Sequence, residues 1–348
     1  MSGALSMDQG RTGIVFVTGA SRSGTTMLSR ILGNHSRILG LRELHYFGDL
    51  CDPADTRQLD KRALHHLAAM IFSRQAREVW GGDPTELELS RARHVCDSLA
   101  PGQRTGYGVF AAALASLAED AGKSIACEQT PRNVFYAQSI LTNLPGAALI
   151  HIVRDPRAVL ASQKNRWKMR LLGAKRIPRY EMIRTWVNYH PVTMAKLWRG
   201  ATNAALRLRG DPRVMLVRFE DLIAEPEAQI RDMCGFLGVP FEPGMSLIPK
   251  WGSSNLKHDS GKKELAKDVL DQWQTVLSDG EIEVVEQIAG ELMRRFSYEP
   301  RSQGGRSSLS VLPHRVSYLI HLIGVALLNP RRALVQVRAM LHRPRRRA

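Results

Sequence analysis

The segment GIVFVTGASRSGTTMLSRIL, residues 13–32, joins three patterns that occur together in one kind of fold. Its first part, Ile14 to Val17, is apolar and largely β-branched, as in a strand buried on both faces of a parallel sheet. A turn rich in Gly and Ser follows from Gly19 to Gly24, and apolar residues then recur at helical spacing as far as Leu32. Strand, glycine loop and helix predict a phosphate cradle, in which backbone N–H groups and the positive end of the helix converge on an anion.

The loop matches the Walker A pattern in all but one position. Residues 19–26 read GASRSGTT, and Thr25 stands where that pattern has a lysine. Nucleotide triphosphatases use this lysine on the β- and γ-phosphates, so its absence counts against ATP or GTP hydrolysis. The cation of the loop lies inside the turn instead, at Arg22. A plain Gly/Ser turn is the alternative, but strand, loop and helix all agree with a phosphate site.

Charge is spread unevenly along the 348 residues, whose net charge is +16. Residues 301–348 hold ten Arg and no Asp, Glu or Lys, which leaves +6 (16 − 10) for residues 1–300. A mildly basic domain suits anionic ligands without requiring nucleic acid, and we expect no nucleic-acid partner. The four widely spaced cysteines predict reduced thiols in a cytoplasmic protein rather than disulfides or a zinc site.

The remaining patterns predict a P-loop-like three-layer α/β/α fold with a central, mostly parallel sheet and helical insertions. We expect a disordered N-terminus at residues 1–12, one domain at 13–300 and a C-terminal tail at 301–348. Within the domain, residues 52–123 form a helical insertion that is a candidate acceptor pocket. Further strands are expected at 123–128, 147–153 and 214–217, and helices at 131–143, 179–208, 226–237 and 278–295.

Two candidate general bases follow the first helix. The strand-like segment 38–47 runs into Glu43 and His45, which would share a face on a strand because side chains alternate. Ligands of doubly wound sheets bind beyond the carboxyl ends of the strands. Either residue is a candidate base near the loop, and the alternative is a surface Glu beside a satisfied His.

A second anion site is predicted where the strand at 147–153 ends and a helix begins. Arg154 and Arg157 lie at this junction, where another phosphate would be stabilised, although an ordinary Arg–Asp surface pair is the alternative. The polar, basic, Gly/Ser-rich segment 250–263 is typical of a mobile loop that closes over a ligand.

The C-terminal tail differs from the rest of the chain. A Gly/Ser linker at 302–310 precedes an apolar stretch at 316–328 that is too short to cross a bilayer, and an Arg-rich end follows. Two interpretations stay open. Residues 313–348 lie peripherally on the anionic inner face of a membrane, or the helix docks on the domain or on a partner.

Taken together, these motifs resemble those of sulfotransferases that use 3′-phosphoadenosine 5′-phosphosulfate (PAPS). Residues 19–26 look like their 5′-phosphosulfate loop, and 153–157 with Ser162 resemble their 3′-phosphate motif. Residues 42–47 are similar to the Glu-containing segment of heparan sulfate sulfotransferases, and tyrosylprotein sulfotransferases carry a catalytic Glu in the same region. Segments 128–131, 218–222 and 236–243 look like bacterial members. The resemblance covers about residues 13–300.

The resemblance implies roles for individual residues. Glu43, rather than His45, would be the general base, and Arg22 would counter charge on the leaving bridge oxygen. The 5′-phosphosulfate ligands would be Ser21, Arg22, Ser23, Gly24, Thr25 and Thr26. The remaining nucleotide ligands would be Arg154, Ser162 and Arg166 around the 3′-phosphate, and Ser254 and Asn255 (with Ser253) in the closing loop.

Two positions depart from the family pattern. Gln129 stands where tyrosylprotein and many bacterial members have a lysine that stabilises charge during transfer. Either Arg132 or Arg22 substitutes for this lysine, or turnover is slow, or the donor contact differs. Phe219 stands at or beside the position of a nucleotide-contacting Tyr.

The resemblance implies in-line sulfuryl transfer from PAPS, without a metal, to an acceptor hydroxyl of a carbohydrate, lipid, tyrosine or small alcohol. The alternatives are a P-loop-type small-molecule kinase and a non-enzymatic binder of anionic surfaces through the basic tail.

Overall fold

The computed structural model describes residues 13–79, 82–164, 166–167, 179–247, 270–301 and 309–328. These residues form two compact units. The described part of the first unit lies within residues 13–154 and 200–247, and that of the second within 155–199 and 270–328. Three predicted features, the N-terminus at 1–12, the closing loop and the Arg-rich end, lie outside the described residues.

The first unit is built on a five-stranded sheet in the order β2-β3-β1-β4-β5. All four strand pairings are parallel. All residues of the central strands β1, β3 and β4 are buried, which explains why these strands are mostly apolar. The strands are β1 (Ile14–Gly19), β2 (Ile38–Gly40), β3 (Ile125–Glu128), β4 (Ala148–Val153) and β5 (Val214–Arg218).

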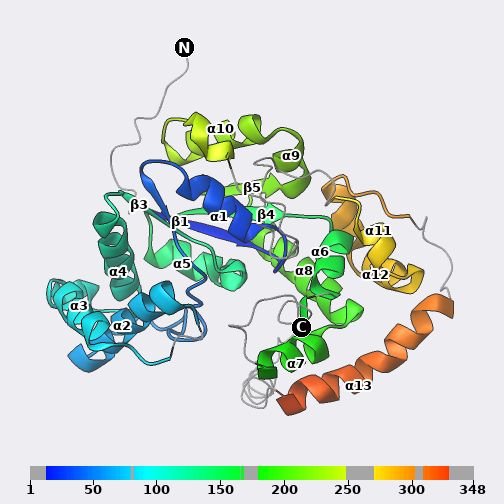
Figure 1. The fold of residues 1–348 in the computed structure, drawn as a ribbon, viewed down its shortest axis with the longest axis horizontal. Helices are drawn as coiled ribbons and strands as arrows, with labels where there is room; N and C mark the ends of the chain where they lie inside the picture. Colours follow the sequence, from blue (N-terminus) through cyan, green and yellow to red (C-terminus); the bar gives the residue numbers. More distant parts are fainter. Residues whose placement is uncertain are drawn as a thin grey trace, which may run out of the picture. The chain divides into compact units, whose positions relative to one another are not determined.

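Helices cover both faces of this sheet. From β1 the chain moves towards one edge to form β2, and from β3 it moves the opposite way to form β4. Because parallel crossovers are right-handed, α1 (Thr25–Gly33) and α5 (Ala137–Asn143) must lie on opposite faces. Figure 1 shows α1 and α10 (Pro226–Leu237) on one side of the sheet and α5 on the other. The predicted three-layer α/β/α fold is confirmed.

Three helices occupy the predicted insertion between β2 and β3. They are α2 (Lys61–Arg77), α3 (Glu86–Asp97) and α4 (Gly106–Asp120). The first two begin at side-chain caps, Asp60 on the Ala63 amide and Thr85 in a capping box with Glu88. An aromatic cluster of Phe16, Tyr46, Phe47, Tyr107 and Phe110 joins α4 to β1 and to the segment after β2.

Three predicted elements were wrong in extent. The strand expected at 38–47 ends at Gly40, and the helix expected at 131–143 starts as a 3₁₀ turn, η2 (Pro131–Tyr136), before α5. The long helix expected at 179–208 is two helices, α7 (Arg179–Asn188) and α8 (Pro191–Leu206). Proline lacks the N–H that would continue a helix and restricts the residue before it, so the break falls at Pro191.

The second unit is helical. It contains α6 (Pro156–Lys164), α7, the first half of α8, α11 (Trp273–Val276), α12 (Asp279–Arg295) and α13 (Leu312–Leu328). The N-terminus of α12 is fixed by Ser278 and Glu281, which form a capping box. Glu281 also accepts hydrogen bonds from Lys164 Nζ at 2.7 Å and Tyr189 Oη at 2.7 Å. Among the helices described, none has the length and apolar character needed to cross a bilayer.

One buried histidine lies in the centre of the sheet. His151 on β4 is 1% exposed and is aligned with Thr18 on β1, whose hydroxyl oxygen is 3.1 Å from His151 Nδ1. Burial lowers the pKa of His151 to about 3. The imidazole is therefore neutral in the folded protein at pH values where a histidine in the unfolded chain is protonated.

We expect His151 to make the fold acid-sensitive. Below about pH 6.5 the imidazole of His151 binds a proton in the unfolded chain but not in the folded one. The free energy of unfolding therefore falls as the pH is lowered to about 3. The fall attributable to this residue is on the order of 4 kcal/mol. Urea denaturation of wild type and His151→Asn across this range measures it. The variant should show a shallower pH dependence, and identical slopes would contradict the prediction.

Candidate active site

The loop between β1 and α1 has the backbone geometry of an anion cradle. Arg22 and Gly24 have left-handed backbone conformations, with φ of +79° and +99°. Left-handed residues in such loops form the concave nests of amide groups that bind anions, and strained non-glycine residues cluster at functional sites. Gly24 also begins α1, whose first turn has neither a side-chain cap nor an acidic residue.

The ends of β4 and β5 hold this loop in shape. A Cβ atom on Gly24 would lie 2.7 Å from the ring of Phe219, so the close approach of loop and ring requires glycine. The Arg154 guanidinium carbon lies 4.3 Å from the centre of the same ring, and Arg154 Nη1 donates to the Arg22 carbonyl at 3.3 Å. Phe219 is only 4% exposed, so its ring packs against the loop and is not accessible for stacking on a ligand.

The hydroxyl groups of the loop fit an anionic ligand. Ser23 is fully buried, and its Oγ has no hydrogen-bond partner in the described part of the chain. Leaving a buried hydroxyl unsatisfied is costly, so such an atom marks a place where a ligand completes the bonding. Thr25 is buried beside it, whereas Ser21 is exposed. Together with the uncapped first turn of α1, these groups suit a phosphosulfate.

Glu43 and His45 meet on a turn rather than on a strand. β2 ends at Gly40, and His45 has a left-handed φ of +46°. The prediction that a strand places Glu43 and His45 on one face was therefore wrong. The turn nevertheless brings the two side chains into contact. Glu43 Oε2 lies 3.1 Å from His45 Nε2, and their side chains are 39% and 27% exposed. The carboxylate is thus oriented by the imidazole and remains accessible.

A buried carboxylate fixes this turn. Glu128, at the end of β3, is 1% exposed and accepts the Leu44 amide at 3.2 Å. It also accepts the Thr130 amide at 3.0 Å, the Thr130 hydroxyl and Asn133 Nδ2 at 2.7 Å. Burial raises the pKa of Glu128 above its ordinary value. Thr130 Oγ1 in turn accepts the His45 amide at 3.0 Å, so both amides after Glu43 are bound from β3.

Helix α2 holds the same turn from its other side. Arg74, which is 8% exposed, donates from Nη1 to the carbonyl oxygens of Leu44 at 2.7 Å and His45 at 2.8 Å. The two residues after Glu43 are therefore bound through both their amides and their carbonyl oxygens. The carboxylate of Glu43 itself bonds only to His45 among the contacts described. The turn presents Glu43 from a rigid support.

Gln129 links the same strand end to the phosphate loop. It is 5% exposed, and its Oε1 accepts the Thr26 hydroxyl at 3.3 Å. Glu128 and Thr130 contact the Glu43 turn, and the residue between them contacts the loop. The three successive residues 128–130 therefore join the two halves of the predicted site.

Arg132, one of two proposed substitutes for the missing lysine, is bound elsewhere. Its Nη2 lies 2.8 Å from Asp49 Oδ1 and 3.3 Å from the Phe47 carbonyl oxygen. These contacts count against Arg132 as the substitute for the lysine.

The predicted 3′-phosphate residues belong to different units. Arg154 ends β4 in the first unit, whereas Ser162 is half-buried on α6 in the second. Arg166 is exposed just after α6. Ser254 and Asn255 lie outside the described residues.

Arg157, the second arginine of the predicted anion site, is a structural residue instead. It is 5% exposed, pairs with Asp155 at 2.7 Å and Glu286 at 3.0 Å, and its guanidinium carbon stacks 4.2 Å from the Trp273 ring centre. The prediction that it receives a phosphate was wrong, because two carboxylates already enclose it. Its pairing with Asp155 was foreseen as the alternative, but this pair is buried rather than on the surface.

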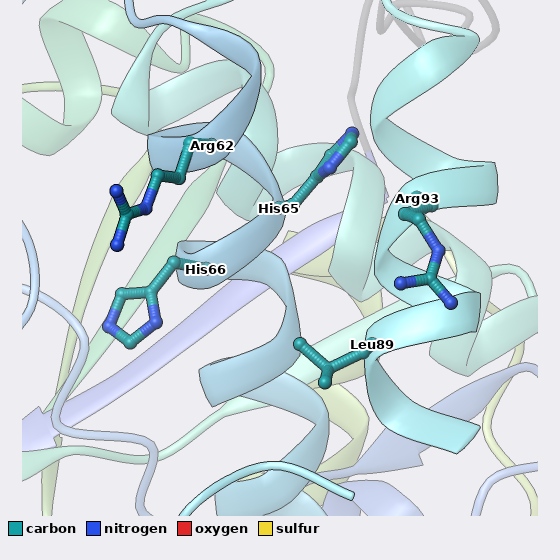
Figure 2. Close-up of a pocket in the computed structure, with 5 residues that line it drawn as sticks. All are labelled: Arg62, His65, His66, Leu89 and Arg93. Atoms are coloured by element: carbon teal, nitrogen blue, oxygen red, sulfur yellow. The ribbon is translucent and has the colours of Figure 1, made fainter. Parts of the chain in front are cut away.

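A separate hollow of about 460 Å³ is lined by Arg62, His65 and His66 of α2 and by Leu89 and Arg93 of α3. Figure 2 shows His65 between the two helices, with Arg62 and His66 directed to the other side of α2. His65 lies nine residues before Arg74 on α2, or about 13 Å along the helix, so this hollow is distinct from the Glu43 turn.

In the part of the chain that the structure describes, no group of His, Cys, Asp or Glu is placed to hold a metal.

Comparison with known proteins agrees with this geometry. The model of the sulfotransferase family matches residues 15–243, from β1 to the segment after α10. The chain belongs to the sulfotransferase family. The predicted membership and the predicted class of enzyme, a PAPS-dependent sulfotransferase, are confirmed.

Individual relatives of this sulfotransferase differ in how much they share with it. Nodulation protein NoeE of Sinorhizobium fredii is 25% identical over 85% of this chain and 68% of its own length. Human carbohydrate sulfotransferase 6 is 31% identical over 44% of this chain, and the match spans 42% of its length. This sulfotransferase therefore spans less than half of the carbohydrate sulfotransferases it matches.

Solved structures of sulfotransferase domains also align with it. The domain from the curacin biosynthetic pathway is 19% identical, with a TM-score of 0.49 over 80% of this chain and 97% of that domain. The domain from the Synechococcus PCC 7002 olefin synthase is 20% identical, with the same TM-score over 81% and 96%.

We expect Glu128→Ala to destabilise the protein by about 2–4 kcal/mol, because it leaves four donors without their acceptor in a buried site. Urea denaturation measures the change. The matched control is Glu227→Ala, which removes an exposed carboxylate paired with Arg231 and should change stability by less than about 0.5 kcal/mol. Equal effects of the two substitutions would show that the Glu128 network does not support the fold.

Proposed function

We propose that this sulfotransferase moves the sulfuryl group of PAPS to a carbohydrate hydroxyl, with Glu43 as the general base. The observation that carries the proposal is the link through residues 128–130. It ties an accessible carboxylate, held by buried hydrogen bonds, to a loop with the backbone and hydroxyl groups that suit a phosphosulfate. Transfer requires a base on the acceptor side and an anion cradle on the donor side, and this link supports both.

The donor is held chiefly by the loop. Residues Ser21 to Thr26 surround the 5′-phosphosulfate with backbone amides and hydroxyls, and Arg22 offsets the charge that develops on the leaving bridge oxygen. Arg154 at the end of β4, with Ser162 and Arg166, binds the 3′-phosphate. Ser254 and Asn255, which lie outside the described residues, stay predicted ligands of the nucleotide. No step in this scheme requires a metal.

Glu43 accepts the proton of the acceptor hydroxyl as the acceptor oxygen attacks sulfur. The new S–O bond forms while the bond between sulfur and the bridging oxygen breaks in line, and that oxygen leaves on the 5′-phosphate of the nucleotide. The hydrogen bond between His45 Nε2 and Glu43 Oε2 orients the carboxylate for this transfer. Most of the remaining catalysis is positioning and charge neutralisation.

A carbohydrate acceptor is supported by the names of the relatives, since several are carbohydrate sulfotransferases. Transfer of labelled sulfate from PAPS to separated oligosaccharide, lipid, tyrosine-peptide and small-alcohol fractions tests this choice. Label in the oligosaccharides supports it, and label confined to another fraction would replace it. Mg²⁺-dependent transfer from ATP, without use of PAPS, would favour a kinase instead.

We expect Glu43→Gln to lower kcat by about 10²- to 10⁴-fold, the usual contribution of a general base, because the amide cannot accept the proton. Binding of the donor product, 3′-phosphoadenosine 5′-phosphate, should be unchanged. His45→Asn is the matched control, since Asn tolerates the left-handed conformation and keeps the base. Greater loss in His45→Asn than in Glu43→Gln would assign the base to His45.

We expect Arg154→Ala to weaken binding of 3′-phosphoadenosine 5′-phosphate by about 10- to 100-fold, the usual worth of a charged hydrogen bond, and that of AMP much less. Calorimetric titration with both nucleotides measures the difference. Because Arg154 also stacks on Phe219, the control is Phe219→Leu, which disturbs the stack and keeps the cation. It should change both affinities alike. Equal losses for both nucleotides in Arg154→Ala would remove Arg154 from the 3′-phosphate site.

A further inference from the structure

Helix α13 turns its most apolar side outward. Large aliphatic side chains recur at spacings of three and four residues, which places them on one stripe of the helix. Ile320 is 70% exposed and Leu327 is 75% exposed. The full set of exposed aliphatic residues is Leu312, Val316, Leu319, Ile320, Leu322, Ile323 and Leu327. We call this set the α13 apolar face.

The opposite side of α13 is more polar and packs on the second unit. Ser317 Oγ lies 3.1 Å from His190 Nε2, and His321 Nε2 lies 2.9 Å from Thr193 Oγ1. The Tyr318 ring receives Lys196 Nζ at 4.6 Å from its centre. A surface helix of a globular protein normally buries its apolar stripe and exposes its polar one. In α13 the arrangement is reversed, so the apolar face has a function other than packing against these helices.

The neighbouring helix adds aromatic residues to this part of the unit. Gly324 of α13 lies against Val187 of α7, with a Cβ built on Gly324 only 3.4 Å from Val187 Cγ1. Helix α7 itself exposes Tyr180, Ile183 and Trp186, the last at 62%. Tyr and Trp are the residues that favour the interface between lipid and water.

The charge of the tail decides between two occupants of this face. Ten Arg and no Asp, Glu or Lys occur in residues 301–348, seven of the Arg after α13. A second copy of the chain would bring the same positive charge against itself, which opposes association. An anionic lipid surface has the complementary charge and also accepts apolar side chains.

We propose that the α13 apolar face lies on an anionic lipid bilayer, with the Arg-rich end providing electrostatic attraction. This proposal does not rest on the sulfotransferase reaction. It gives a structural basis to the membrane contact predicted for residues 313–348. One side of α13 docks on its own unit, and the other side is left for lipid.

Flotation of the full chain with phosphatidylcholine vesicles, with and without phosphatidylglycerol, tests the proposal. Wild type should bind the anionic vesicles, and the double variant Leu319→Gln with Ile323→Gln should bind them at least about tenfold more weakly, because it removes apolar area from the contact. The matched control is Leu87→Gln, an 80% exposed leucine on α3 of the first unit, which should bind like wild type.

Three outcomes would overturn the proposal. They are no binding of wild type to anionic vesicles, equal binding of wild type and the double variant, and a wild-type dimer in sedimentation that the double variant converts to monomer without vesicle binding. Affinity for 3′-phosphoadenosine 5′-phosphate is measured on the same samples. It should be unchanged in the double variant, so failure of membrane binding is distinguishable from failure of the proposed reaction.

Discussion

The buried carboxylate of Glu128 is the interaction on which the arrangement of the site depends. A carboxylate removed from water is tolerated only when hydrogen bonds replace its hydration, and Glu128 obtains four of them. The donors come from the turn after β2, from the end of β3 and from η2, which are separate stretches of the chain. β3 lies between β2 and β1, so this carboxylate is anchored within the sheet. The turn that carries Glu43 is therefore tied by hydrogen bonds to the buried end of β3.

Alternation at the end of β3 gives the site two sides. Glu128 and Thr130 bind the Glu43 turn, and Gln129 binds Thr26 of the phosphate loop. The Glu43 turn and the loop after β1 are thus both held by one short backbone segment. Gln129, for which the resemblance implies the position of a lysine in some members of the family, is here a neutral hydrogen-bond acceptor for the loop.

The spacing of apolar residues and the Gly/Ser turn predicted those helices and strands that depend on neighbouring residues in the sequence. The strand, glycine loop and helix at residues 14–33 and the helix at 226–237 appear where the periodicity placed them. The path after Gly40 was not predictable in this way, because hydrogen bonds from Glu128, Thr130 and Arg74, far away in sequence, bend the chain at His45. Arg157 was misassigned for a similar reason. Glu286, one of the two carboxylates that enclose it, lies 129 residues later in the chain.

The contact of Gly24 with Phe219 and Arg154 has a consequence for how the protein is made. The ring that supports the loop belongs to Phe219, which directly follows β5 and stands almost two hundred positions after Gly24. Contacts between residues so distant in sequence form late in folding, because a long loop must close before they contribute. During synthesis the loop lacks its support until Phe219 has emerged and β5 has joined the sheet. The shape of the loop is thus acquired late in folding, although the loop itself is a local turn.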